Sequence, residues 1–328
     1  MSSLGHVGAV TDPGRRRRRN EDAYVVEPPL FAVADGMGGA QAGEVASRLA
    51  AAALKESGAE AGGEQRIVSL IQEANRRVYD RSNRDPSASG MGTTMTVALV
   101  EDGQVAFGHV GDSRAYLIRD GAMEQLTEDH SLVAELMRSG KLSPEEAETH
   151  PQRSVITRAL GTDPDVDVDT FTIAAQTGDV FLLCSDGLTT MVSNQSILDL
   201  VELHRGDMDK ALRALVSAAN KGGGEDNITV VAFEISAEAL LHDGETREHV
   251  LEPAAVEDDE VTLTEADSVP VVDTAVIPAE EIQSELRAKE RADRSARRRR
   301  LRRRIVAWLA LLLIVAAVAL VLYLRFVR

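Results

Sequence analysis

Residues 31–39 read FAVADGMGG and constrain the fold more than any other stretch of the chain. Four apolar residues lead directly into Asp35, and glycines follow it. This order predicts a buried strand that ends at a carboxylate, because glycines let the backbone turn tightly and approach another group closely. Burying a carboxylate alone costs much free energy, so we expect a cation beside Asp35.

Two later stretches repeat this pattern. The apolar run 180–184 is followed by Asp186, and Asp226 stands just before a predicted strand at 228–233. Upstream, residues 20–22 read NED. Because hard divalent cations bind oxygen ligands, carboxylates at several strand ends indicate a metal site better than they indicate a surface charge pattern.

The chain of 328 residues changes character along its length. Residues 1–237 mix strand-like runs, helical runs and turns, as a globular domain does. Residues 238–290 are acidic with few aromatic residues, which indicates a flexible linker. A basic segment at 291–304 precedes the uncharged residues 305–324. We interpret this segment as juxtamembrane and expect residues 325–328 to form a short extracytoplasmic tail.

Residues 305–324 predict a transmembrane helix. Twenty residues at about 1.5 Å each span about 30 Å, the thickness of the hydrocarbon core of a bilayer. A buried core helix is the alternative, but Leu, Val and Ala dominate the segment, and Trp308 and Tyr323 lie near its ends. Arginines are concentrated before the span, so the positive-inside rule predicts a single-pass protein of the cytoplasmic membrane with residues 1–237 in the cytoplasm.

Other features agree with a cytoplasmic domain. No hydrophobic signal-peptide core follows Met1, and the single cysteine, Cys184, rules out an internal disulfide and fits a reducing compartment. The formal net charge of −17 is an average over blocks, and it argues against nucleic acid as the main partner of the globular part.

Residues 15–19 form a run of five arginines in this acidic chain. Taken alone, such a run is typical of a solvated or nucleic-acid-binding patch. Its position just before residues 20–22 favours another interpretation, because a planar guanidinium near a metal site can bind a phosphate group bidentately.

The pattern of elements predicts an α+β fold. Residues 129–158 are polar and helical, and we expect them to form a mobile flap beside the site. Since the strands are short and few alternate with helices, a two-sheet antiparallel β-sandwich flanked by α-helices fits better than a doubly wound parallel sheet. Spacing predicts helices at 43–55, 66–83, 197–201 and 208–220, and strands at 24–26, 30–34, 96–100, 105–110, 115–118, 170–173, 180–184 and 228–235.

Each Asp-Gly pair alone is weak support for a site, because Asp-Gly is also a common turn. Together, the motifs closely resemble those of the bacterial type 2C metal-dependent Ser/Thr protein phosphatases. The resemblance spans roughly residues 5–237 and is carried, in order, by residues 14–22, 33–39, 90–94, 111–114, 185–188 and 226–229.

The resemblance implies a centre with two Mg²⁺ or Mn²⁺ ions. Asp35 would bridge them, and the Gly36 carbonyl would bind one. Asp186 and Asp226 would hold the other ion. Two further carboxylates would help directly or through water, those of Glu21 and Asp22.

The resemblance also implies a substrate-binding arginine and a third, weaker ion. Arg17, at the family's spacing within its run, would bind the substrate phosphate. The third ion would use Asp112, Asp186 and the backbone at Ser154.

The proton donor is less clearly implied. Some family members have histidine where this chain has Met37, and that histidine acts as the general acid. His150, in the expected flap, is a candidate here, with an ordinary loop residue or a metal-bound water as the alternatives.

The implied activity is hydrolysis of phosphoserine and phosphothreonine by a metal-activated water, with phosphorylated proteins, Ser/Thr kinases and their substrates as partners. Two cations neutralise the phosphoryl oxygens and supply the nucleophile, so Cys184 needs no role and reads as a buried small hydrophobe. Two alternatives stay open: a catalytically silent phosphoprotein-binding module, and an enzyme of the same fold for a small phosphoester.

Overall fold

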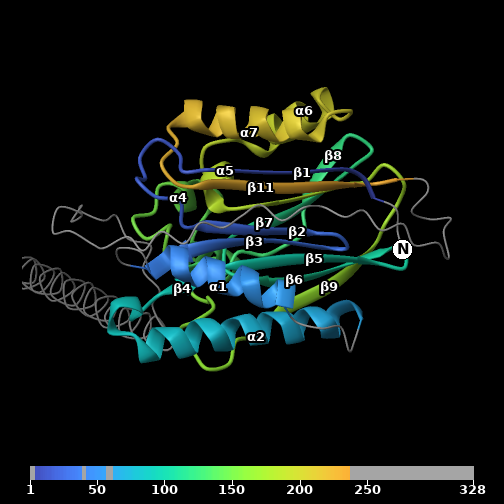
Figure 1. Cartoon of the computed structure of the whole chain (residues 1–328). Coiled ribbons are helices and arrows are strands. Elements are labelled where there is room, and N and C mark those ends of the chain that lie inside the picture. The colour runs from blue at the N-terminus through green and yellow to red at the C-terminus, as the bar shows by residue number, and fades with distance from the viewer. Residues whose placement is uncertain (1–3, 39–41, 57–61, 237–328) are drawn as a thin grey trace, which may run out of the picture. The chain divides into compact units, whose positions relative to one another are not determined.

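The protein is described by a computed structural model over residues 4–38, 42–56 and 62–236 (Figure 1). Two antiparallel sheets pack face to face, and helices cover both outer faces. The predicted α+β sandwich is therefore confirmed. The predicted linker, basic segment and transmembrane helix lie outside the described residues, among which no helix is both long and apolar enough to cross a membrane.

The first sheet has the strand order β1-β11-β10-β7-β8, and the second has the order β2-β3-β5-β6-β9 with the short β4 added to β3. All these pairings are antiparallel. The strands are β1 (Leu4–Asp12), β2 (Asp22–Glu27), β3 (Leu30–Met37), β4 (Gly92–Thr93), β5 (Met95–Glu101), β6 (Gln104–Val110), β7 (Arg114–Arg119), β8 (Ala122–Gln125), β9 (Asp169–Ala174), β10 (Val180–Cys184) and β11 (Ile228–Ile235).

The helices form two outer layers. The pair α1 and α2 covers the second sheet, and α5, α6 and α7 cover the first. Short helices α3 and α4 and a 3₁₀ turn, η1, lie in the connections. The helices are α1 (Ala42–Glu56), α2 (Gly63–Arg84), η1 (Pro86–Ala88), α3 (Leu132–Arg138), α4 (Pro144–Glu148), α5 (Asp186–Thr189), α6 (Asn194–Leu203) and α7 (Met208–Gly222).

Strand periodicity explains the core between the sheets. Successive side chains of a strand point to opposite faces. In β3, Phe31 and Val33 therefore face the other sheet, while Ala32 and Ala34 pack with the helices of the outer layer. Phe31 stacks on Phe233 of β11, with ring centroids 4.2 Å apart. This strand is buried on both faces, and it carries Asp35 at its end.

Towards one end of the strands, the interior between the sheets becomes polar. Side chains alternate between the two faces of a strand, and Phe107 and Phe181 lie on the faces that meet between the sheets. Nearer the polar end, the same faces carry hydroxyl and imidazole side chains. All of these polar side chains are buried and hydrogen-bonded. This polar layer comprises Thr94, Thr96, His109, Ser113, Ser185 and Thr229.

Two expectations from the sequence need correction. The first strand, β1, was not predicted, because Gly5, His6 and Gly8 interrupt its apolar pattern; its backbone pairs along β11. The expected mobile flap is partly core, since Val155 and Ile156 are buried. Backbone hydrogen bonds also join their segment to residues 130–132, which lead into helix α3.

His130 fastens this insert to the end of β6. Its N–H donates to the Gly111 carbonyl at 2.8 Å, its carbonyl accepts from the Thr157 N–H at 2.9 Å, and its Nδ1 accepts from the Gly111 N–H at 3.0 Å. Nδ1 therefore carries no proton, and Nε2 donates to Asp169 at 3.1 Å. Burial, reinforced by the charge on Arg158 and opposed by Asp169, lowers the pKa of His130.

A His130→Asn variant keeps an acceptor near Gly111 but cannot take up a proton. A histidine whose pKa is lowered on folding stabilises the fold above its unfolded pKa of about 6.5 and loses that contribution as the pH falls. Between about pH 7 and about pH 5, we expect the wild-type free energy of unfolding to fall faster than the variant's, by up to about 1.4 kcal/mol per pH unit. Urea titrations at each pH measure this, and parallel curves would contradict it.

Candidate active site

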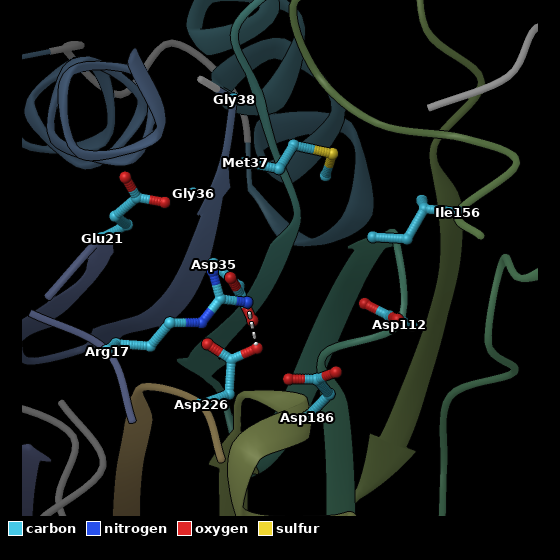
Figure 2. Close-up of a pocket in the computed structure, with 10 residues that line it drawn as sticks. All are labelled: Arg17, Glu21, Asp35, Gly36, Met37, Gly38, Asp112, Ile156, Asp186 and Asp226. Carbon is cyan, nitrogen blue, oxygen red and sulfur yellow. Dashed lines mark hydrogen bonds and ion pairs between the residues drawn. The ribbon is translucent and has the colours of Figure 1, made fainter. Parts of the chain in front are cut away.

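A pocket opens at the polar end of the sandwich, where both sheets and the surrounding loops contribute side chains (Figure 2). Figure 2 shows the carboxylates of Asp112, Asp186 and Asp226 directed into one space, with the Arg17 guanidinium reaching in beside Asp226. The lining residues are Arg17, Glu21, Asp35, Gly36, Met37, Gly38, Asp112, Ile156, Asp186 and Asp226.

Strand pairing brings Asp22 and Asp35 together. They are directly opposite each other on the neighbouring strands β2 and β3, so their side chains share a face. The Asp35 N–H donates to Thr94 Oγ1 of the polar layer at 2.9 Å, and its carbonyl accepts from the Thr93 hydroxyl at 2.9 Å. Asp22 Oδ2 accepts from the Ser185 hydroxyl of the other sheet at 2.9 Å. Buried hydroxyls thus fix the backbone of Asp35 and the carboxylate of Asp22.

Gly36 is where the chain beyond Asp35 meets helix α1. A Cβ on this residue would lie 2.1 Å from the Gly43 carbonyl oxygen and 2.5 Å from that of Glu21. No side chain fits in this space, and the Gly36 N–H donates to the same Glu21 carbonyl at 3.1 Å. The close approach explains the glycine after Asp35 and ties the segments of Asp35 and Glu21 to each other.

Asn227 joins the segments that carry Asp226, Glu21 and Arg17. Its side-chain oxygen accepts from the Glu21 N–H at 2.8 Å. Its amide donates to the carbonyls of Pro13 and Arg19 at 3.1 and 2.8 Å, on either side of Arg17. Sequence reasoning placed this residue within a motif but gave it no part in the site, because its partners lie about two hundred positions away in the chain.

Asp186 begins the short helix α5, one residue after the end of strand β10. The next residue, Gly187, lies so close to the Asn227 carbonyl that a Cβ there would be 2.0 Å from the oxygen. Asp186 and Asp226 are thereby held side by side at the ends of two adjacent strands.

Burial and mutual repulsion disfavour the charged forms of these carboxylates. Burial raises the pKa of Glu21 and Asp112 to about 7 and that of Asp22 to about 6. Burial, and then the charges of neighbouring aspartates, raise the pKa values of Asp35 and Asp186 well above the usual range. The cluster therefore needs positive charge to remain ionised at neutral pH.

Arg17 is the only positively charged side chain among the lining residues of the described chain. Its Nη2 donates to Asp226 Oδ2 at 2.8 Å. Burial opposes its charge, but Asp226, followed by Glu21 and Asp35, raises the pKa of Arg17 above its ordinary value. One guanidinium cannot balance so many carboxylates.

The unpaired oxygens fit divalent cations. Asp22 Oδ1 and Asp186 Oδ1 are buried without a hydrogen-bond partner in the described part of the chain. In that part no three carboxylate, imidazole or thiol side chains are gathered around one point as a complete ligand set. The carboxylates instead face the pocket from separate elements, which suits Mg²⁺ or Mn²⁺, since such ions complete their coordination with water.

The structure brings most of the predicted site residues together. Seven of them line the pocket, and Asp22 lies behind it against Ser185. Ser154 and His150 are not among the lining residues, and Ser154 is exposed. His150 Nδ1 instead accepts from the Gln152 N–H at 3.2 Å within its own loop. The seven are Arg17, Glu21, Asp35, Gly36, Asp112, Asp186 and Asp226.

Cys184 is unsuited to nucleophilic chemistry. It is fully buried on the helix-facing side of β10, away from the lining residues. Burial raises the pKa of its thiol to about 12, so the thiolate is scarcely populated at neutral pH. This agrees with the interpretation of Cys184 as a small core residue.

Solved structures share this fold. That of the Mycobacterium tuberculosis serine/threonine phosphatase PstP/Ppp has a TM-score of 0.67 and 37% identity, and the match covers 71% of this chain and 100% of that one. The catalytic domain of PstP in complex with two manganese ions has a TM-score of 0.65 and 35% identity, with 71% and 99% covered.

Sequence comparison agrees. The "Serine/threonine phosphatase stp" of Listeria innocua is 42% identical over 241 residues, which cover 70% of this chain and 95% of that relative. The family profile described as "Protein phosphatase 2C" matches residues 15–228, which contain every lining residue of the pocket. The chain therefore belongs to the protein phosphatase 2C family.

Proposed function

We propose that this chain is a metal-dependent phosphatase that removes phosphate from phosphoserine and phosphothreonine in proteins. The observation that carries the proposal is a pocket lined by carboxylates from separate elements, with one guanidinium among them and an unpaired Asp186 oxygen at its wall. The Ser/Thr phosphatase names of the relatives and the two manganese ions of the PstP catalytic domain support it.

The residues present fit two Mn²⁺ or Mg²⁺ ions. Asp35, with the Gly36 carbonyl, would hold them on one side, and Asp186 and Asp226 on the other. Glu21 and Asp22 would help, while Asp112 would serve a third ion. When bound, such ions supply a nucleophile from water at neutral pH and neutralise the phosphoryl oxygens.

The chain's own residues bind and orient the substrate. Arg17 can turn its free N–H groups to two oxygens of the phosphate while its Nη2 stays beside Asp226. Met37 and Ile156 give the pocket an apolar wall. The wall suits the carbon atoms of a threonine or serine side chain and limits the access of bulk water. The parts of Ser154 and His150 stay predictions.

We also propose, from the sequence alone, that residues 305–324 anchor the enzyme in the cytoplasmic membrane with the phosphatase domain in the cytoplasm. The acidic linker at 238–290, treated as a coil, has a reach of about 40 Å. Such a tether raises the effective concentration of the domain near membrane-bound phosphoproteins. Ser/Thr kinases and their substrates at the membrane are the partners that this placement favours.

Removing a carboxylate from the pocket should abolish turnover. Asp35→Asn or Asp226→Asn should lower kcat for a phosphothreonine peptide by several powers of ten, because both charge stabilisation and the nucleophile depend on the ligand set. EDTA should have the same effect on the wild type. The measurement is phosphate release in the presence of Mn²⁺.

Cys184→Ala is the matched control for these variants. It should keep wild-type kcat, since the thiol is buried outside the pocket. A folded Cys184→Ala protein without turnover would replace the proposed chemistry with attack by a thiolate.

The ion pair between Arg17 and Asp226 gives a second prediction. Arg17→Ala should raise KM for a phosphopeptide at least tenfold, because a bidentate, charge-assisted contact is lost. It should also tighten Mn²⁺ binding in calorimetry, because Asp226 is freed from its guanidinium partner. Arg17→Lys should restore the metal affinity but only part of the KM, since an ammonium lacks the planar fork. A weaker Mn²⁺ affinity in Arg17→Ala would contradict this account.

The membrane proposal is tested in intact spheroplasts. Protease added outside should leave the phosphatase domain undigested on a blot, and the enzyme should sediment with membranes after cell breakage. Digestion from outside would overturn the orientation. Recovery in the soluble fraction would overturn the anchor.

A further inference from the structure

We infer that Arg15, Arg16 and Arg18 form a second anion site that selects protein segments carrying a further phosphate near the one being removed. The inference rests on the proposed function, since it concerns the substrate of the same pocket. Three observations carry it: the backbone of the run is fixed, Arg17 reaches the pocket while these three arginines are exposed, and the three have no side-chain partner in the described part of the chain.

The backbone of the run is held at both ends. The N–H groups of Arg15 and Arg16 donate to the Gly224 carbonyl at 2.8 and 3.1 Å. The Asn227 amide donates to the Arg19 carbonyl at 2.8 Å. Because Gly224 and Asn227 flank Asp226, the run is fastened to the rim of the pocket. Its exposed side chains therefore project from a fixed base.

Side-chain direction separates Arg17 from its neighbours. Arg17 is half-buried and reaches Asp226, whereas Arg15, Arg16 and Arg18 are exposed. Since consecutive Cα atoms lie about 3.8 Å apart, the Cα atoms of the three exposed arginines lie within about 8 Å of the Arg17 Cα.

The three outward arginines have no ion pair or side-chain hydrogen bond with any described residue. This is unusual in a chain whose formal net charge is −17, because most other arginines of the described residues pair with carboxylates. Unpaired positive charge beside a pocket that binds a phosphate group indicates that these arginines bind an anion from outside the chain. The paired arginines include Arg48, Arg66, Arg76, Arg77, Arg81, Arg84, Arg114, Arg119, Arg158, Arg205 and Arg213.

The chemistry of the site favours a phosphate over a carboxylate. A phosphate carries close to two negative charges and three acceptor oxygens, which match the forked donors of several arginines. An extended peptide advances at most about 3.6 Å per residue, so a second phosphorylated residue one to four positions away would reach the run. The preferred substrate is therefore a multiply phosphorylated segment.

The test uses the full chain in detergent with two peptides. Both carry one phosphothreonine, and one also carries a non-hydrolysable phosphonate analogue of phosphothreonine two residues away, so that only one phosphate can be released. We expect the wild-type kcat/KM to be about tenfold higher for the peptide that also carries the phosphonate. This ratio of the two kcat/KM values should fall in high salt, because salt screens exposed charges. In the variant R15Q/R16Q/R18Q the ratio should fall to about one.

A matched control removes the same charge elsewhere. The variant R48Q/R84Q/R213Q changes three exposed helical arginines, none of which lines the pocket, and should keep the wild-type ratio. If this control lowered the ratio as much as R15Q/R16Q/R18Q, overall charge would account for the effect and the inference would be wrong.

The outcomes separate the inference from the proposed function. Wild-type turnover with equal kcat/KM for the two peptides would overturn the inference alone. If the wild type turned over neither peptide, both the proposed function and the inference would be overturned. A variant with the acidic residues 257–260 neutralised tests whether the run binds the chain's own acidic segment. If this variant raised kcat/KM for both peptides equally and left the ratio of the two values near one, the acidic segment would be the ligand of the run and the inference would be wrong.

Discussion

Repulsion among the pocket carboxylates is the constraint on which the rest of the structure depends. Left free, Asp35, Asp186 and their neighbours would move apart or take up protons, as their raised pKa values indicate. The fold prevents separation by hydrogen bonds to the backbones of Asp35 and Glu21 and to the side chain of Asp22. Hydroxyls of the polar layer hold Asp35 and Asp22, and the Asn227 amide holds the segments of Glu21 and Asp226. The carboxylates therefore stay in place for cations to bind.

The pocket depends on both sheets at once. Asp22 and Asp35 come from the second sheet, whereas Asp186 and Asp226 stand at strand ends of the first. The hydroxyl of Ser185 bridges the two by donating to Asp22 Oδ2 and accepting from the Thr229 N–H at 3.0 Å. Since the aromatic stack of Phe31, Phe233 and Phe181 sets how the sheets pack, the spacing of the carboxylates is fixed by apolar packing some residues away.

Much of this could be predicted from the sequence. Continuous apolar runs that lead to Asp35 and Asp186 locate both the strands and the site, because a buried strand leaves few places for a carboxylate. The order of strands in the sheets was beyond such reasoning, as were the parts of Ser185, Asn227 and His130, since their partners are set by tertiary packing. The strand β1 was missed because it forms by pairing with β11 rather than by its own propensity. The burial of Val155 and Ile156 was likewise missed, because most residues of 129–158 are polar.

The carboxylate cluster also affects which substitutions the protein can accept during evolution. Each aspartate adds electrostatic repulsion that destabilises the folded state. Its replacement by asparagine therefore stabilises the fold while it removes the activity. An inactive descendant would accordingly be at least as stable as its parent and would keep the arginine run at 15–19. Catalysis, rather than the fold, is then what requires Asp35 and Asp186. Gly36 and Gly187 are different, because the folded backbone itself leaves no room for a side chain there.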